Sequence, residues 1–512
     1  MRRELLLALV GIALLACGLA AIVPRQARTF QIQMDACHTP VTVMEPYQEP
    51  PIGNAIALHG FASNRDLMLW VGEWLAAQGL RVYTFDLPGH GDSTEHFNYA
   101  AAESCAGQAI AAMADRGDIN PDRTVLLGHS MGGEIAIRLA DRFPAAATIA
   151  LSPAPMVAPQ RMPSNLLVVS AEFDLIWLRR QARKLQRLAG GPRSTPEDFA
   201  QRRAFALVDM PLTDHVSLLF DSRPAKDAAA WARQALGIPG PVENVPGAPR
   251  LGFLLGIAGL ILFFPLAAAL LAGRAQPNAP PAGPPALSPK VALANWAVAA
   301  VFAVALIAVV PYYEWLGLSN GSYLTSFLLI AGVALLPLVA RRETLSFNWS
   351  VRGVSAAAVL AMLFALAFHA WDSGAYALSA DSHRALLETI ARSFLLTTPR
   401  WLRLAPAVLA TFPYILAEEI ALGPRQPGVN LRRFGVFVAM RFELWLVMVA
   451  AVLLTLNSEV LIALLFPAFI AVSVLQRYAS DAIRRRTGSL AAAAIFGAIL
   501  TGAFIVSAFP LT

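Results

Sequence analysis

Charge is scarce in the second half of this 512-residue sequence. Only 14% of all residues are charged and 56% are hydrophobic, whereas typical soluble domains have about 25% charged and about 45 to 50% apolar residues. Charged residues are frequent from Arg25 to about Arg250, but from Leu251 onward apolar stretches of membrane-spanning length follow one another. This lack of charge excludes a wholly soluble chain and predicts a soluble domain joined to a membrane domain.

A single basic patch is also missing. The net charge is +6, but the arginines cluster at the ends of hydrophobic segments, whereas nucleic-acid binding would gather them on one surface. We therefore expect membrane lipids, and no nucleic acid, as partners. The sequence does not indicate a protein partner.

The N-terminal segment "MRRELLLALVGIALLACGLAAIVPRQAR" begins with Arg2, Arg3 and Glu4. No charged residue follows from Leu5 to Val23. This pattern predicts one membrane-spanning signal anchor over residues 1–24. A cleaved signal peptide is the alternative, and "LLAC" ending at Cys17 resembles a lipoprotein processing site. The apolar run continues past Cys17, where a lipidated protein usually turns polar, and this favours the uncleaved anchor.

Eight further spans are predicted, at about 251–272, 291–311, 323–340, 354–371, 404–422, 436–456, 459–475 and 489–509. Alternate loops carry the positive charge, namely Arg2, Arg3, Arg274, Lys290, Arg341, Arg342, Arg352, Arg425, Arg432, Arg433, Arg477 and Arg484 to Arg486. Because positively charged loops stay cytoplasmic, we expect a cytoplasmic N-terminus, an extracytoplasmic soluble domain and an outer C-terminus. The loops at 312–322 and 457–459, without Lys or Arg, agree with this topology, and the mixed loop at 372–403 weakens it.

The soluble region alternates β-like and helix-like segments, as a parallel sheet with crossover helices requires. The runs "FQIQM" and "VTVME" precede this alternation and predict antiparallel edge strands. In an oxidising compartment Cys37 and Cys105 can form a disulfide, although two small buried cysteines are an equal reading. The fold class predicted is α/β, a doubly wound and mostly parallel sheet.

Ser130 lies in "LLGHSMGG", where a predicted strand over 124–128 ends and a helix begins. A serine in such a tight turn needs small neighbours, and Gly128 and Gly132 provide them. Its hydroxyl then lies near a helix N-terminus, which favours developing negative charge. The motif alone is common, so an ordinary turn serine stays an alternative at this point.

The region of about 52–236 resembles the α/β-hydrolase family through four ordered features. These are "HGF" at 59–61, "DLPGHGDS" at 86–93, "GHSMGG" at 128–133, and an acid followed by a histidine after the last two strands. The resemblance implies Ser130 as nucleophile, Asp174 in "SAEFD" as triad acid and His215 in "TDHVSLL" as base. It also implies an oxyanion hole of the Phe61 and Met131 backbone N–H groups.

In such a triad a neutral imidazole takes the serine proton and a carboxylate holds the imidazole. This chemistry needs no organic cofactor and no metal. Glu172 and Asp214 lie near enough in sequence to be alternative acids. We interpret three histidines and two aspartates as structural residues that hold loops around the pocket, namely His59, His90, His129, Asp86 and Asp92. The stretch 153–165 is too short for a helical cap, so we expect a site without a lid.

The membrane half contains ionisable residues inside predicted spans, which are costly there and indicate function. They are His369, Asp372, Glu418, Glu419, Arg441 and Glu443. The simpler interpretation is that Glu418 or Glu419 pairs with Arg441 to hold helices together. "YILAEEIALGPR" is also faintly similar to the Glu-Glu-x-x-x-Arg motif of CPBP intramembrane proteases, but Arg425 is displaced and no histidine follows His383.

The sequence therefore predicts four segments: a signal anchor (1–24), an α/β-hydrolase domain (25–236), a linker (237–250) and a polytopic helical domain of about eight spans (251–512). The predicted function is a membrane-embedded serine hydrolase that cleaves carboxylic esters or thioesters of lipid-like or acylated substrates. One alternative is a transporter or channel-like protein with an accessory extracytoplasmic hydrolase domain. Another is a peptidase-type serine hydrolase.

Overall fold

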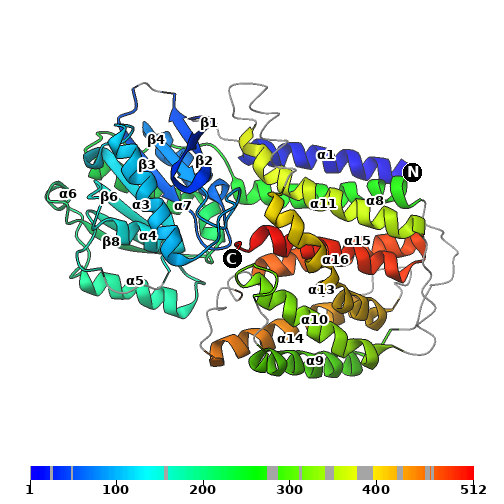
Figure 1. The fold of residues 1–512 in the computed structure, drawn as a ribbon. Coiled ribbons are helices and arrows are strands. Elements are labelled where there is room, and N and C mark those ends of the chain that lie inside the picture. Colours follow the sequence, from blue (N-terminus) through cyan, green and yellow to red (C-terminus); the bar gives the residue numbers. More distant parts are fainter. Residues whose placement is uncertain are drawn as a thin grey trace. The chain divides into compact units, whose positions relative to one another are not determined.

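The computed structural model describes residues 2–22, 27–47, 50–154, 159–273, 286–310, 314–340, 351–377, 396–423, 431–455, 462 and 466–512. The chain forms two compact units (Figure 1). We call residues 16–256, 369–397 and 510–512 the sheet unit, and residues 1–15, 257–368 and 398–509 the helical unit.

The sheet unit is built on one eight-stranded sheet in the order β1-β2-β4-β3-β5-β6-β7-β8. Strands β1 and β2 pair antiparallel at one edge, and β2 pairs antiparallel with β4. All further pairs are parallel. The predicted α/β fold with two antiparallel edge strands is thus confirmed. The strands are β1 (Ala27–Met34), β2 (Thr39–Pro46), β3 (Gly53–Leu58), β4 (Leu80–Phe85), β5 (Thr124–His129), β6 (Ala147–Leu151), β7 (Leu166–Ala171) and β8 (Phe205–Met210).

Helices cover both faces of this sheet, as a parallel sheet requires. In β3, Ala55 and Ala57 belong to a core with α2 and α7, whereas Ile56 and Leu58 belong to a second core with α3 and α4. Successive strand side chains point to opposite faces, so both faces of the central strand are buried. The helices of this unit are α2 (Leu69–Ala76), α3 (Tyr99–Asp115), α4 (Met131–Leu139), α5 (Ile176–Leu188), α6 (Pro196–Ala200) and α7 (Ser222–Ala235).

A disulfide joins Cys37 to Cys105. Cys37 lies in the short helix η1 (Ala36–His38) between the two edge strands, and Cys105 lies in α3. The bridge closes a sequence separation of 68 residues and ties the edge of the sheet to a helix on one of its faces. The sequence left open whether these two cysteines are bonded or separately buried, and the structure shows the disulfide.

The helical unit contains long apolar helices. Seven helices in the described part of the chain are long and apolar enough to cross a membrane, namely α1, α8, α9, α10, α13, α14 and α16, which indicates a membrane protein. Their bounds, with those of two further helices, are α1 (Arg2–Ile22), α8 (Pro249–Ala272), α9 (Pro289–Val309), α10 (Gly321–Val339), α11 (Val351–Ala377), α13 (Thr398–Leu422), α14 (Leu431–Thr455), α15 (Phe466–Thr487) and α16 (Leu490–Ala508).

The two other predicted spans, 354–371 and 459–475, fall on α11 and α15. Within α11 the apolar stretch described is Val351–Ala365, and residues 456–461 and 463–465 before α15 lie outside the described residues. The prediction that Arg477 and Arg484 to Arg486 form a loop is wrong, because all four lie in α15. Arg477 and Arg484 are buried there, since partners on other helices neutralise them.

Removing the bridge should destabilise the sheet unit. A Cys37→Ser, Cys105→Ser variant is expected to lose about 2 to 4 kcal/mol of unfolding free energy, because the unfolded chain regains the freedom of the closed loop. Thermal melts of the purified chain with and without a reductant would measure this. Cys17→Ser is the matched control, because Cys17 is free and exposed. Equal melting of reduced and oxidised wild-type protein would contradict the prediction.

Candidate active site

Ser130 lies in a sharp turn between β5 and α4, in a strained backbone conformation with φ 54° and ψ −116°. Non-glycine residues at positive φ cost energy and concentrate at functional sites. The surrounding backbone leaves no room for larger neighbours: a Cβ on Gly128 would lie 2.1 Å from the Gly132 carbonyl oxygen, and one on Gly132 would lie 2.2 Å from that of Leu58. Both glycines are therefore required by the turn.

Asp174 and His215 are brought together from two neighbouring strands. Asp174 follows β7 and His215 follows β8, and their side chains are only 1% and 7% exposed. The Nδ1 atom of His215 lies 3.0 Å from Asp174 Oδ1 and 3.2 Å from Oδ2. The Leu175 backbone N–H donates to Asp174 Oδ1 at 3.0 Å and fixes the carboxylate. This pair can hold the imidazole with Nδ1 protonated and Nε2 free to accept a proton.

The two alternative acids bind elsewhere. Glu172 Oε2 accepts the Leu212 backbone N–H at 2.7 Å. Asp214 accepts hydrogen bonds from the backbone N–H groups of Val216 and Ser217 and from the Ser217 hydroxyl. Burial alone would raise the pKa of Asp214, but the hydrogen bonds from Ser217 outweigh it and the pKa is lowered. Both carboxylates thus support loop structure.

His129 connects the base to the serine turn. It immediately precedes Ser130, its Nε2 lies 2.8 Å from the His215 carbonyl oxygen, and the two imidazole rings are 4.8 Å apart. Burial, with a smaller contribution from His215, lowers the pKa of His129 to about 3. The neutral ring therefore donates from Nε2 and ties the His215 backbone to the residue next to Ser130.

The predicted oxyanion residues flank Ser130. Met131 is the first residue of α4, and Phe61 follows His59 and Gly60 after β3. A Cβ on Gly60 would lie 3.0 Å from Ser130 Cβ, so the Phe61 loop passes directly beside the serine. His59 fixes this loop, because its Nδ1 donates to the Gly60 carbonyl at 2.8 Å and its Nε2 accepts the Leu87 N–H at 2.9 Å. Burial lowers the pKa of His59 and keeps the ring neutral.

Arg65 holds the loop that carries Asp86 and Asp92. The sequence analysis did not single out this arginine. The Arg65 backbone N–H donates to Asp86 Oδ1 at 2.8 Å, and its guanidinium binds Asp86 and also Asp92, the latter at 2.7 Å. Asp86 further accepts the Asp92 N–H at 2.9 Å. These bonds fit the interpretation of both aspartates as loop-fixing residues. The signal available was the pair of aspartates itself, since two carboxylates close in sequence, one of them buried, need a cation beside them.

The predicted lack of a lid remains a prediction, because residues 155–158 of the stretch 153–165 lie outside the described residues. The same holds for the side chains of His369 and Asp372 and for Arg425.

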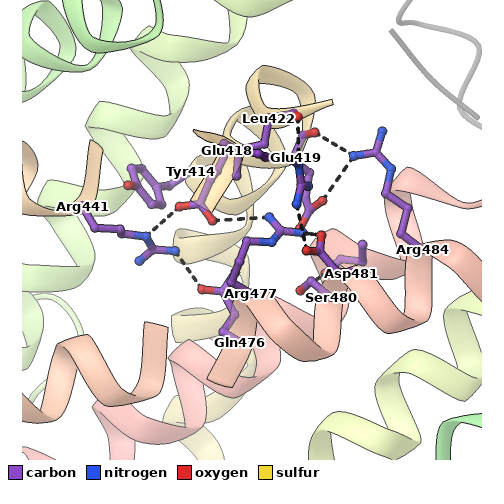
Figure 2. Close-up of polar contacts among 12 residues, drawn as sticks. Tyr414, Glu418, Glu419, Leu422, Arg441, Gln476, Arg477, Ser480, Asp481 and Arg484 are labelled. Carbon is purple, nitrogen blue, oxygen red and sulfur yellow. Dashed lines mark hydrogen bonds and ion pairs between the residues drawn. The ribbon is translucent and has the colours of Figure 1, made fainter. Parts of the chain in front are cut away.

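A second polar cluster lies in the helical unit, between α13, α14 and α15 (Figure 2). As predicted, Glu418 pairs with Arg441, at 2.6 Å. Glu419 pairs with Arg477 at 2.7 Å and with Arg484 at 3.4 Å. Glu418 and Glu419 are fully buried, and the arginines beside them offset the cost of burying two carboxylates.

This cluster also closes the end of α13. The Arg484 guanidinium donates to the carbonyl oxygens of Glu419 and Gly423, and Arg433 donates to those of Leu422 and Gly423. The last carbonyls of a helix lack partners within the helix and attract positive charge. The cluster therefore has a structural task in joining three helices.

The family comparison agrees with the sheet topology. A family model described as Hydrolase_4, serine aminopeptidase, S33, matches residues 49–205. The sheet unit has the α/β-hydrolase fold.

Two curated relatives are similar to a short stretch of this chain. The uncharacterized protein YfhR of Escherichia coli strain K12 is 35% identical over 92 residues, which are 17% of this chain and 32% of that protein. YfhR of Salmonella typhi is 32% identical over 85 residues, 17% of this chain and 29% of that protein. The chain thus spans less than a third of the length of these relatives.

Solved structures are similar at lower identity. TT1662 from Thermus thermophilus is 18% identical with a TM-score of 0.33, over 41% of this chain and 100% of that one. An esterase from Pyrobaculum calidifontis is 17% identical with a TM-score of 0.33, over 46% and 92%. A bacterial membrane phospholipase A is 18% identical with a TM-score of 0.31, over 44% and 92%.

Breaking one ion pair of the helical cluster should destabilise that unit. Glu418→Leu leaves the partly buried Arg441 without its carboxylate, and breaking a buried ion pair typically costs about 3 to 5 kcal/mol. We expect a lower melting temperature of the purified chain, partly restored in the double variant Glu418→Leu, Arg441→Leu. Glu314→Gln, at an exposed position, is the control. An unchanged melting temperature for Glu418→Leu would show that the pair does not hold the helices.

Proposed function

We propose that the chain is a membrane-embedded serine hydrolase that cleaves carboxylic esters or thioesters of lipid-like or acylated substrates. The observation that carries the proposal is the buried Asp174–His215 pair, tied through His129 to the strained serine turn. This arrangement uses three costly features, namely a positive φ, a buried carboxylate and a buried imidazole. Their combination is explained by nucleophilic catalysis and not by stability.

In the proposed reaction, Ser130 Oγ attacks the acyl carbonyl carbon while Nε2 of His215 takes the hydroxyl proton. Asp174 stabilises the imidazolium that forms and keeps Nδ1 protonated. The oxyanion accepts hydrogen bonds from the Phe61 and Met131 N–H groups, each worth about 3 kcal/mol in related sites. The partial positive charge of the helix dipole at the N-terminus of α4 adds to this stabilisation.

The imidazolium then gives its proton to the leaving alcohol or thiol, and the acyl group remains on Ser130. Water attacks this acyl-enzyme, with His215 again as the base, and releases the acid and the free serine. Every proton passes through His215 Nε2, so the fixed Nδ1–Asp174 contact serves both halves of the reaction. The mechanism uses side chains and backbone N–H groups of this chain alone.

Apolar side chains support a lipid-like substrate. Phe173, Ile176 and Leu212 are 64%, 60% and 73% exposed on the segments that follow β7 and β8. These are the same segments that carry Asp174 and His215. Exposed large apolar side chains grouped at one site mark contacts with apolar ligands or a membrane surface.

An extracytoplasmic location of the sheet unit, with the N-terminus in the cytoplasm and the C-terminus outside, is part of the proposal. The Cys37–Cys105 bridge supports it, because disulfides persist in oxidising compartments and are rare in the cytoplasm. Within the helical unit, the carboxylates Glu418 and Glu419 are neutralised by arginines, and this favours a structural task over the transporter alternative.

The nucleophile can be tested with a fluorophosphonate probe on the purified full chain. The wild type should be labelled and Ser130→Ala should not be, because the probe reacts with an activated serine hydroxyl. Asp174→Asn should lower the esterase rate by about 10³- to 10⁴-fold, since the imidazole loses its partner. Asp214→Asn and Glu172→Gln are matched controls that should keep most activity. Equal labelling of wild type and Ser130→Ala would refute the proposal.

The substrate class can be tested with esters and thioesters of graded acyl length. We expect kcat/KM to rise by up to about fourfold per CH₂ group while the chain is being buried, at about 0.8 kcal/mol each. Replacing Phe173 and Leu212 by Ser should flatten this rise without abolishing cleavage of acetyl esters. Preference for aminoacyl amides over all esters would favour the peptidase-type alternative.

A further inference from the structure

Residues 510–512 follow the last helix in the chain but belong to the sheet unit. The Leu511 backbone N–H donates to the Gly89 carbonyl at 2.9 Å, and the Phe97 N–H donates to the Leu511 carbonyl at 2.6 Å. Leu511 is only 1% exposed. A segment distant in sequence is thus held by a reciprocal pair of backbone hydrogen bonds to the loop of residues 88–97.

This loop is shaped around the Leu511 backbone. Gly89 has a φ of 77°, and a Cβ there would lie 2.7 Å from the Leu511 carbonyl oxygen and 2.6 Å from Phe97 Cβ. Only glycine accepts both this conformation and this close approach without strain. The glycine in the stretch "PGH" is therefore required by its positive φ and by the close approach of both Phe97 and Leu511.

Aromatic contacts connect the same loop to the Phe61 loop. The Phe97 ring lies 5.3 Å from the Phe61 ring and 5.1 Å from the His90 ring, and His90 lies 5.8 Å from Phe61. These edge-to-face arrangements are favourable and directional. The side chain of Phe61 is thereby set by a loop whose two ends are bound to Leu511.

We propose that Leu511 is a positioning residue for the oxyanion hole, an inference that rests on the proposed hydrolase function. Its two backbone hydrogen bonds fix Gly89 and Phe97, these fix the ring of Phe61, and the ring fixes the direction of the Phe61 N–H. Leu511 touches no reacting atom, so its effect is on the geometry of one oxyanion donor. It acts on the transition state more than on substrate binding.

The expected size follows from the donor that is displaced. Complete loss of one oxyanion donor lowers kcat by about 10²- to 10³-fold. Loosening its support moves the donor without removing it, so we expect a fall in kcat of about 5- to 50-fold with KM changed by less than about twofold.

The test uses Leu511→Pro in the full chain, which removes the N–H that donates to Gly89. Leu511→Ile keeps both backbone hydrogen bonds, and Thr512→Ala changes an exposed neighbour; both are controls that should match the wild type. kcat and KM for a soluble short-chain ester are measured and normalised to the fraction of protein labelled by a fluorophosphonate at Ser130. The normalisation counts only folded sites.

A wild-type kcat per labelled site in Leu511→Pro would overturn the proposal. So would equal losses in Leu511→Pro and Thr512→Ala. If Leu511→Pro does not fold, Phe97→Leu replaces it: this variant keeps the backbone hydrogen bonds but removes the ring contact with Phe61, and it should show the same fall in kcat at constant KM. Failure of the wild type to be labelled at Ser130 would refute the hydrolase function itself and is a different result from these.

Discussion

The positive φ of Ser130 is the constraint on which the rest of the candidate site depends. An L-residue adopts this conformation only when its surroundings impose it, and here Gly128, Gly132 and Gly60 impose it by close approach of three backbone segments. The sheet supplies the rigidity, because β5 and β3 are adjacent parallel strands with both faces buried. The geometry of the serine turn is therefore a property of the fold and not only of one side chain.

The sequence was sufficient wherever local pattern and chain order carry the information. The strands of the sheet, its antiparallel edge and the sharp turn at Ser130 follow from hydrophobic patterning and glycine spacing. The resemblance to the α/β-hydrolase family implied Asp174 and His215, which follow the last two strands in the family's order. The sequence favoured Asp174 as the acid but left Glu172 and Asp214 as alternatives, because side-chain direction depends on loops that no local rule describes.

Long-range pairing explains what the sequence could not give. Arg65 lies 21 residues before Asp86, and Leu511 binds the loop at Gly89 from the far end of the chain. The error at α15 has a related origin. Hydropathy treats each arginine as a residue to be kept in water, but Arg477 is buried because Glu419 and Asp481 lie beside it, and that proximity exists only in the folded helices.

The position of Leu511 in the chain gives its two backbone hydrogen bonds a consequence for biosynthesis. The loop of residues 88–97 is made early, whereas residue 511 is made only after the apolar helices that the structure describes. On the proposed role of Leu511, the nascent hydrolase has its serine, histidine and aspartate before it has a fully supported oxyanion donor. The order of translation itself would then keep an acyl-cleaving site weak until the apolar helices have been synthesised.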